Sequence, residues 1–177
     1  MKVKSMLKKY IIILTLVLIL MLITSCNRDP EYKSPDQIAT ETQAKIMECF
    51  LNGDQERIKD MLCEKCKKSP DIDEQIKKAF KFIDGEIISY NKDHWGSSGG
   101  AHERKDIGGH TSEVITNKGT EYTISYKAWL TNEEDPDLVG VYFISIKNDT
   151  EFNKYDLSEY SRSEIENILK KCIIYVE

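Results

Sequence analysis

The spacing of the apolar residues changes at Gly85, and this change limits what the chain can fold into. Before Gly85, apolar side chains recur every three or four residues, which is the spacing of amphipathic helices. After it, apolar and polar residues alternate, most clearly over residues 122–130, as they do in half-buried β-strands. Helices and strands are therefore segregated along the chain. This order predicts the α+β class and argues against a parallel sheet built from βαβ units.

Three helices are expected before this point, over residues 34–53, 54–68 and 69–85. The first has the best-defined start, because Ser34 can cap it and Gln37 can reach back to complete a capping box. The second runs into a lysine-rich stretch and carries the motif Cys63-Glu64-Lys65-Cys66 near its C-terminal end. The third is the most regular amphipath, with apolar residues at helical intervals along its length.

Strands are expected after Gly85 over residues 86–91, 110–116, 121–130 and 138–147. The stretch 92–105 is rich in glycine and serine and reads as a mobile loop. The last of the four strands is apolar on both faces, so it should lie inside the sheet. A further helix is expected near the C-terminus, where Ser161 with Glu164, or Ser163 with Glu166, would form a capping box. Residues 173–176 would then add a strand or simply pack against the core.

The first 25 residues have the composition of an export signal. Four lysines precede an uncharged apolar run over residues 10–23, which is shorter than the roughly 20 residues that a membrane-spanning helix needs. Residues 22–26 resemble the signal of bacterial lipoproteins, in which the thiol of Cys26 receives a diacylglycerol and the preceding peptide bond is cut. Two acyl chains on one residue anchor a protein stably to a membrane. An uncleaved membrane anchor is the alternative.

This interpretation divides the chain into a signal peptide (1–25), a lipid anchor with its tether (26–35), one domain (36–149) and a helical extension (150–177). Removal of residues 1–25 takes away four lysines and no acidic residue, so the formal net charge changes from −5 to −9. A nucleic-acid-binding surface needs clustered Lys and Arg against phosphates, and this acidic chain lacks such a patch. The expected partners are the membrane, through Cys26, and a small molecule or envelope protein.

Four short stretches carry a resemblance to a known family: Leu51-Asn52-Gly53-Asp54, Asp71-Ile72-Asp73-Glu74-Gln75-Ile76, Phe82-Ile83-Asp84-Gly85-Glu86-Ile87 and Val139-Gly140-Val141-Tyr142. Residues 38–148 as a whole resemble the DUF5104 family of bacterial lipoprotein domains, and residues 151–177 lie outside the resemblance. The order of elements also resembles the NTF2-like, or cystatin-like, fold. In that fold the helices pack on a curved antiparallel sheet around a cone-shaped pocket. The resemblance implies no activity and no functional residues.

If such a pocket exists, Tyr122, Tyr126 and Tyr142 are the residues placed to line it, with His110 nearby. Phenol hydroxyls there would orient a small ligand, while the rings supply apolar contact. Alternating tyrosines in a sheet are, however, more often part of ordinary packing. No obvious carboxylate occupies a buried strand position, and this absence argues against catalysis.

The favoured function is a non-catalytic, membrane-anchored module outside the cell that binds a small ligand or a protein. No catalytic residue, cofactor or metal is expected. Against a metal site, the spacing of His94, His102 and His110 matches no compact ligand pattern. A small hydrolase or isomerase with one of these histidines as the base is one alternative. An accessory or protective subunit of an envelope complex is the other.

The motif with Cys63 and Cys66 places two thiols where they could form a disulfide. Its expected position near a helix C-terminus disfavours redox catalysis, because the helix dipole there opposes a thiolate. A structural disulfide, or two unreactive thiols, is therefore expected. Cys49 and Cys172 are the other thiols of the mature chain, and the sequence does not determine how the four are paired.

Overall fold

The computed structural model describes residues 33–91, 95–101 and 104–177, and Ser34–Glu177 form one compact unit. The helices that precede the sheet are α2 (Pro35–Asn52), α3 (Gln55–Met61), α4 (Glu64–Lys67) and α5 (Ile72–Phe82). The strands are β1 (Ile87–Ser89), β2 (Trp95–Ala101), β3 (Arg104–Thr116), β4 (Glu121–Asn132), β5 (Gly140–Asn148) and β6 (Ile173–Val176). Between β4 and β6 lie η1 (Pro136–Leu138), α6 (Asp149–Phe152), η2 (Leu157–Glu159) and α7 (Arg162–Cys172). None of the helices in this part of the chain is long and apolar enough to cross a membrane.

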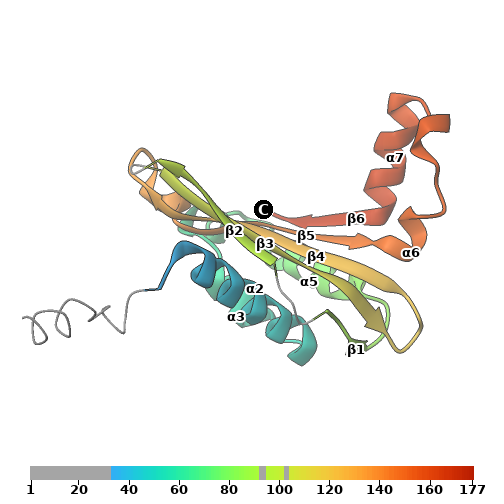
Figure 1. Cartoon of the computed structure of the whole chain (residues 1–177), viewed down its shortest axis with the longest axis horizontal. Coiled ribbons are helices and arrows are strands. Elements are labelled where there is room, and N and C mark those ends of the chain that lie inside the picture. Colours follow the sequence, from blue (N-terminus) through green and yellow to red (C-terminus); the bar gives the residue numbers. More distant parts are fainter. Residues whose placement is uncertain (1–32, 92–94, 102–103) are drawn as a thin grey trace, which may run out of the picture. The chain divides into compact units, whose positions relative to one another are not determined.

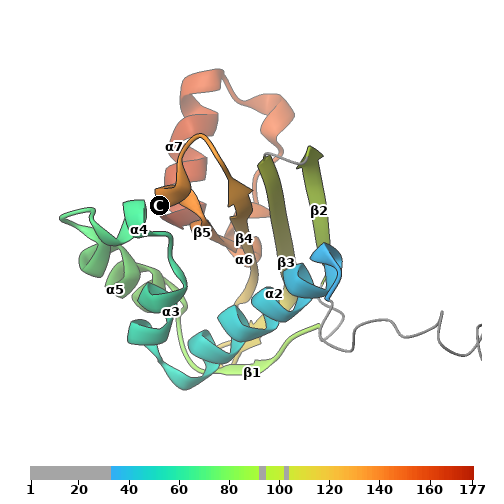
Figure 2. The same ribbon diagram turned by 90° about the vertical axis from the view of Figure 1, so that its left-hand side faces the viewer.

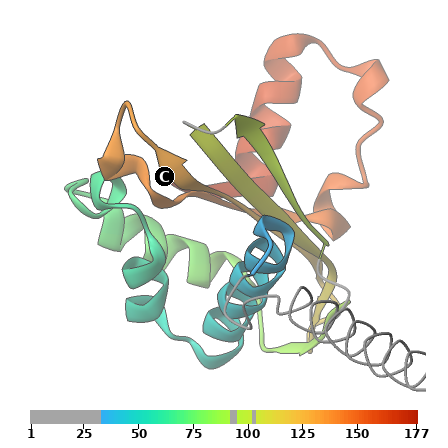
Figure 3. The same ribbon diagram turned by 60° about the vertical axis from the view of Figure 1, so that its left-hand side comes forward.

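The strands form one antiparallel sheet in the order β1-β3-β4-β5-β6, and β2 pairs with β3 beside β1. Helices α2, α3 and α5 lie on one face of this sheet, and α7 lies toward the other (Figures 1 and 3). The face that carries α2, α3 and α5 is called the inner face, and the opposite one the outer face. The predicted α+β class is confirmed.

Helix ends agree closely with the sequence signals that predict them. At the start of α2, the Ser34 hydroxyl accepts from the backbone N–H of Gln37, and the Gln37 side chain accepts from the N–H of Ser34. Gly53 ends the helix with φ of 69°, a left-handed conformation that glycine adopts at little cost. Ser161 and Glu164 form the predicted capping box of α7. Local side-chain chemistry determines these ends, so the sequence predicts them.

The stretch 92–105 was expected to be a loop, and this expectation is wrong for its described residues. Strand β2 pairs with β3 from Trp95 opposite His110 to Ala101 opposite Arg104. Pairing with β3 satisfies the backbone of this glycine-rich segment, which outweighs the low strand propensity of glycine. Its glycines also allow close packing, because a Cβ on Gly96 would lie 2.8 Å from the backbone nitrogen of Thr40 in α2. Figure 2 shows α2 passing beside β2 and β3.

The second predicted helix is broken into two, and the break falls at the cysteine motif. Helix α3 ends at Met61, and Leu62 forms an isolated bridge with Val141 at the start of β5. The Cys63 N–H donates to the Val141 carbonyl at 2.8 Å, which holds Cys63 in an extended conformation. Cys63 therefore caps the N-terminus of α4, whereas the sequence placed the motif near a helix C-terminus. A contact with a distant strand causes the difference.

The C-terminal residues complete the sheet. Strand β6 pairs with β5, so the strand alternative for residues 173–176 is confirmed. Strand β5 consequently has neighbours on both sides, as its two apolar faces predict.

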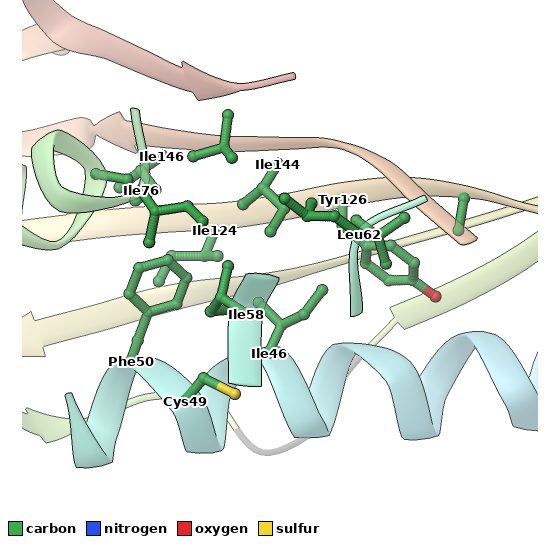
Figure 4. Packing of buried hydrophobic residues seen from close by; sticks show 14 of the residues in the cluster. Ile46, Cys49, Phe50, Ile58, Leu62, Ile76, Ile124, Tyr126, Ile144 and Ile146 are labelled. Carbon is green, nitrogen blue, oxygen red and sulfur yellow. The ribbon is translucent and has the colours of Figure 1, made fainter. Parts of the chain in front are cut away.

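Apolar side chains from three helices and the sheet fill the space between them (Figure 4). Helix α2 contributes Ile46 and Phe50, and α3 contributes Ile58. Opposite them, Ile124 and Ile144 project from β4 and β5. Burial of each such side chain stabilises the fold by about 1.5–3 kcal/mol, so this layer supplies much of the driving force for folding.

Two polar side chains fasten α2 to the sheet within this apolar layer. The Tyr126 hydroxyl donates to the Ala39 carbonyl at 2.7 Å. The buried Gln43 amide donates to the Thr111 hydroxyl at 2.9 Å and to the Ile124 carbonyl at 3.1 Å. These bonds have a defined direction, so they specify how α2 lies on β3 and β4 in a way that apolar contact alone does not.

We predict that Tyr126→Phe lowers the free energy of unfolding by about 1 kcal/mol, because it removes a buried hydrogen bond and keeps the ring. Urea unfolding monitored by circular dichroism measures the change. Tyr175→Phe is the matched control, since Tyr175 is exposed and the change should stay within about 0.5 kcal/mol. Equal effects of the two substitutions would contradict the anchoring role of the Tyr126 hydroxyl.

Helix α7 is held to α6 by a charged cluster around Glu151. Its carboxylate accepts hydrogen bonds from Lys154 at 2.6 Å, from Lys171 in α7 at 2.7 Å and from the Tyr155 hydroxyl at 3.2 Å. The bonds from Lys154 and Lys171 lower the pKa of Glu151 from 4.5 to about 2. A depressed carboxyl pKa contributes stability above the unfolded pKa, and this contribution is lost as the pH falls through the folded pKa.

We therefore predict that α7 stays docked near pH 5 and loosens as the pH falls from 4.5 toward 2. Amide hydrogen exchange of residues 162–172, corrected for its intrinsic pH dependence, measures this opening. In Glu151→Gln the helix should exchange faster at neutral pH and lose the pH dependence. Glu166→Gln is the control. Glu166 also lies on α7, but its ion pair is long, at 4.0 Å from the exposed Arg162. Unchanged exchange in Glu151→Gln would contradict the anchoring role of Glu151.

Candidate functional site

Tyr122 and Tyr126 belong to the core on the inner face of the sheet. The Tyr122 hydroxyl donates to the Phe82 carbonyl at 3.2 Å and accepts from the Asp84 N–H at 2.9 Å. Tyr126 is 2% exposed, and burial raises the pKa of its hydroxyl to about 12. Both hydroxyls bond to the backbone of the helical segment. They hold the helices to the sheet, whereas the sequence predicts that these two tyrosines line a ligand pocket.

Tyr142 lies apart from these two residues, on the outer face of the sheet. Its ring stacks on Trp129, with centroids 6.0 Å apart and an interplanar angle of 22°. Burial raises the pKa of the Tyr142 hydroxyl, and the negative charge of Asp106 raises it further. The three tyrosines of the predicted pocket therefore do not converge on one space.

A hollow of about 360 Å³ opens on the outer face where β2, β3 and β4 meet, and it includes His110. We call it the outer hollow. The residues that give it its chemistry are Gly99, Asp106, Gly108, His110, Ser125 and Lys127. Tyr126 also borders it, but with its backbone, because the ring of Tyr126 points to the inner face. His110 and Tyr126 are thus the predicted site residues that the structure brings together.

The alternation of β-strands explains how these residues come to share one face. Asp106, Gly108 and His110 are spaced by two along β3, so their side-chain positions point the same way. Across the sheet, Gly108 pairs with Lys127 and His110 pairs with Ser125. Because glycine carries no side chain, Gly108 leaves a floor between the polar residues around it. Strand geometry therefore builds the outer hollow.

Two opposite charges border this floor. Asp106 is half-buried and Lys127 is exposed. As diagonal neighbours across β3 and β4, they should lie about 7–8 Å apart. Within the described part of the chain, no ion pair or side-chain hydrogen bond uses the Asp106 carboxylate or the Lys127 ammonium. No described residue therefore neutralises either charge.

Sequence reasoning found His110 but missed Asp106 and Lys127. The signal was the spacing Asp106-x-Gly108-x-His110, which places two polar side chains around a glycine on one face of a strand. Because the sequence predicts a loop over residues 92–105, it assigns Asp106 to no strand. His94, His102 and Cys26 lie outside the described residues.

A second hollow, of about 450 Å³, lies where the ends of α2 and α5 meet β1. Phe50, Asn52, Gly53, Phe80, Gly85 and Glu86 are among its lining residues. Two of the stretches that carry the family resemblance meet there. Their glycines have a structural explanation, because Gly53 and Gly85 have φ values of 69° and 99° and form the turns that end α2 and precede β1. Turn geometry alone therefore accounts for much of this hollow.

The two cysteines of the motif lie side by side in the buried corner between α4 and β5. Their sulfurs are 3.2 Å apart, and the Cys66 thiol donates to the Tyr142 carbonyl at 3.6 Å. Burial raises the pKa of the Cys66 thiol to about 12, and its hydrogen bond with Cys63 adds to the increase. Cys49, Cys63, Cys66 and Cys172 are all buried as free thiols in this structure. Within residues 33–91, 95–101 and 104–177, no three His, Cys, Asp or Glu side chains are grouped to hold a metal ion.

A comparison with protein families identifies the family of this chain. Residues 45–168 match the model of a family described as a domain of unknown function, DUF5104. The chain belongs to the DUF5104 family. The match extends past Asn148 through most of α7, so the family domain includes much of the segment that the sequence analysis had left outside the resemblance. No curated protein matches the chain.

Proposed function

We propose that this DUF5104 protein is a lipid-anchored binding module on the outer side of the cell membrane, and that the outer hollow binds a small polar ligand without converting it. The observation that carries the binding site is the pair of opposite charges, Asp106 and Lys127, beside the floor at Gly108. The location rests on the lipoprotein-like sequence that ends at Cys26.

The charges around the outer hollow favour one class of ligand. The Asp106 carboxylate accepts hydrogen bonds from an ammonium group, and the Lys127 ammonium donates to a carboxylate. His110 and Ser125 add further hydrogen-bonding groups on the same side. A volume of about 360 Å³ lies within the roughly 300–1,000 Å³ range of small-molecule pockets. A free amino acid or a short peptide has both charges at a suitable size.

Catalysis by the histidine of this hollow has less support. An acid–base pair needs its members within hydrogen-bonding distance of each other or of one shared group. Asp106 and His110 are four residues apart on one strand, which corresponds to about 13 Å at the usual rise per residue. They cannot act as a hydrogen-bonded pair, so a hydrolase or isomerase would need its acid from elsewhere. The binding function requires no such partner.

The alternative of an envelope-complex subunit is favoured by one observation. Ile88 on β1 is 65% exposed, and Leu51 at the end of α2 is 41% exposed. Leu51 and Ile87 line the second hollow together. Exposed apolar side chains around a hollow suit contact with another protein. This surface is separate from the outer hollow, so the two functions can be tested by different substitutions.

We predict that Cys26→Ala abolishes incorporation of labelled fatty acid into the chain expressed in a bacterium, because acylation requires the thiol of that residue. Gel fluorography of the immunoprecipitated chain measures the label. Cys172→Ser is the matched control and should retain full labelling. Labelling of Cys26→Ala at the wild-type level would contradict the lipid anchor and leave the ligand site unaffected.

We predict that the full-length chain, purified in detergent, binds a member of a panel of free amino acids and dipeptides, and that Asp106→Asn and Lys127→Gln each weaken this binding about tenfold. Loss of one charged hydrogen bond accounts for an effect of this size. Isothermal titration calorimetry measures the affinity, and native mass spectrometry detects any ligand that copurifies. Asp60→Asn and Lys77→Gln remove the same charges from α3 and α5 and should leave the affinity unchanged. Unchanged binding in Asp106→Asn and Lys127→Gln would overturn the site.

A further inference from the structure

Cys63 and Cys66 are a pair of buried thiols that the proposed ligand site does not use. We propose that they form an oxidation site, which closes into an intramolecular disulfide between the N-cap of α4 and the third residue of that helix. The partner in the reaction is a disulfide of a small molecule or of an oxidising protein outside the cytoplasm. The oxidising environment rests on the proposed export of the chain, and the pair itself is independent of the outer hollow.

The geometry of the corner brings the two sulfurs together. Cys63 is extended, with φ of −65° and ψ of 156°, and its side chain accepts from the Cys66 N–H at 3.5 Å as the cap of α4. The sulfurs are 3.2 Å apart, and a disulfide bond is about 2.05 Å long. Closing it requires the sulfurs to approach by about 1.2 Å. Rotation about the Cα–Cβ bonds can supply a shift of that size.

Contacts with β5 hold this corner in place. The Cys63 N–H donates to the Val141 carbonyl at 2.8 Å. Gly140 lies against the Cys63 backbone, because a Cβ at Gly140 would be 3.1 Å from the Cys63 Cα. The Cys66 thiol donates to the Tyr142 carbonyl. The sheet therefore positions both cysteines, and the same sulfurs are brought together each time the chain folds.

The reaction is a thiol–disulfide exchange. One cysteine thiolate attacks a sulfur of the external disulfide and forms a mixed disulfide, releasing the first external thiol. The second cysteine then attacks the sulfur of the first, and the other external thiol leaves. The two cysteines lose two electrons and two protons, and the external disulfide is reduced to two thiols. No further oxidant is required.

Burial sets the rate of the exchange and protects its product. Cys63 is 1% exposed and Cys66 is 8% exposed, and burial keeps the Cys66 thiol protonated at neutral pH. Exchange in the folded chain therefore requires α4 to open. Helix α4 has only four residues, and its Glu64 is exposed, so this opening is local. Once formed, the disulfide is shielded from reducing agents by the same burial.

Oxidation has a structural consequence that can be measured. The disulfide removes the thiol hydrogen of Cys66, so the bond to the Tyr142 carbonyl is lost. It also links the cap of α4 to the third residue of that helix, which restricts local opening. Amide hydrogen exchange over residues 63–68 should consequently be slower in the oxidised chain than in the reduced chain.

The deciding experiment treats the reduced, folded, full-length chain with oxidised glutathione and then blocks free thiols with N-ethylmaleimide under denaturing conditions. Chymotrypsin does not cut between the two cysteines, so one peptide carries both. We expect this peptide to lack maleimide and to be lighter than the dithiol form by two hydrogen atoms. The disulfide form should exceed the dithiol by about tenfold or more, as expected for a stable structural disulfide.

The other cysteines supply matched controls. Cys49→Ser and Cys172→Ser should leave the disulfide peptide unchanged, and Cys66→Ser should abolish it. Cys63→Ser should abolish it too while keeping a good helix cap, so loss of the disulfide there is not loss of the fold. A wild-type peptide with two maleimide groups after oxidation, or a disulfide that includes Cys49 or Cys172, would overturn the proposal. If the purified chain forms the disulfide but the chain in cells is fully reduced, the oxidation site stands and the exported location is wrong.

Discussion

The fold depends on the contact between α2 and the inner face of the sheet. Apolar side chains supply most of the favourable free energy, but the Tyr126 hydroxyl and the Gln43 amide determine the direction in which the helix lies. The side-chain oxygen of Gln43 accepts no hydrogen bond from any described residue, so the hydrogen bonding of this buried amide is incomplete. The remaining bonds evidently outweigh that cost. The rings of Tyr122 and Tyr126 lie in this layer, and their hydroxyls bond to the backbone of the helical segment, so both residues belong to the core.

The candidate site lies on the outer face of the sheet. Glycines serve both faces of the same pair of strands. The side-chain position of Gly96 faces inward, where the missing Cβ lets α2 approach. The side-chain position of Gly108 faces outward, where the missing Cβ leaves the floor of the outer hollow. Two charges beside that floor, Asp106 and Lys127, take no part in the ion pairs of the described residues. Charges that no described residue neutralises, next to an open hollow, are the physical basis for the proposed ligand site.

The corner at α4 shows how a long-range contact changes local chemistry. Without β5, the sequence suggests a continuous helix through the cysteine motif. The hydrogen bond from Cys63 to Val141 breaks that helix and moves the motif to the start of a new one. The sulfurs then lie 3.2 Å apart in a buried position. This corner connects to the outer face through Tyr142, whose carbonyl accepts from Cys66 and whose ring stacks on Trp129.

The sequence by itself determined the α+β class, the helix caps at Ser34 and Ser161 and the internal position of β5, because local side-chain chemistry and burial patterns decide these features. It also identified His110 as part of a candidate site. Only the tertiary structure decided that residues 95–101 form a strand, that Tyr126 is a core residue and that Asp106 lies near Lys127. These outcomes depend on contacts between residues far apart in the chain, such as Gly96 against Thr40, and local propensity carries no information about such contacts.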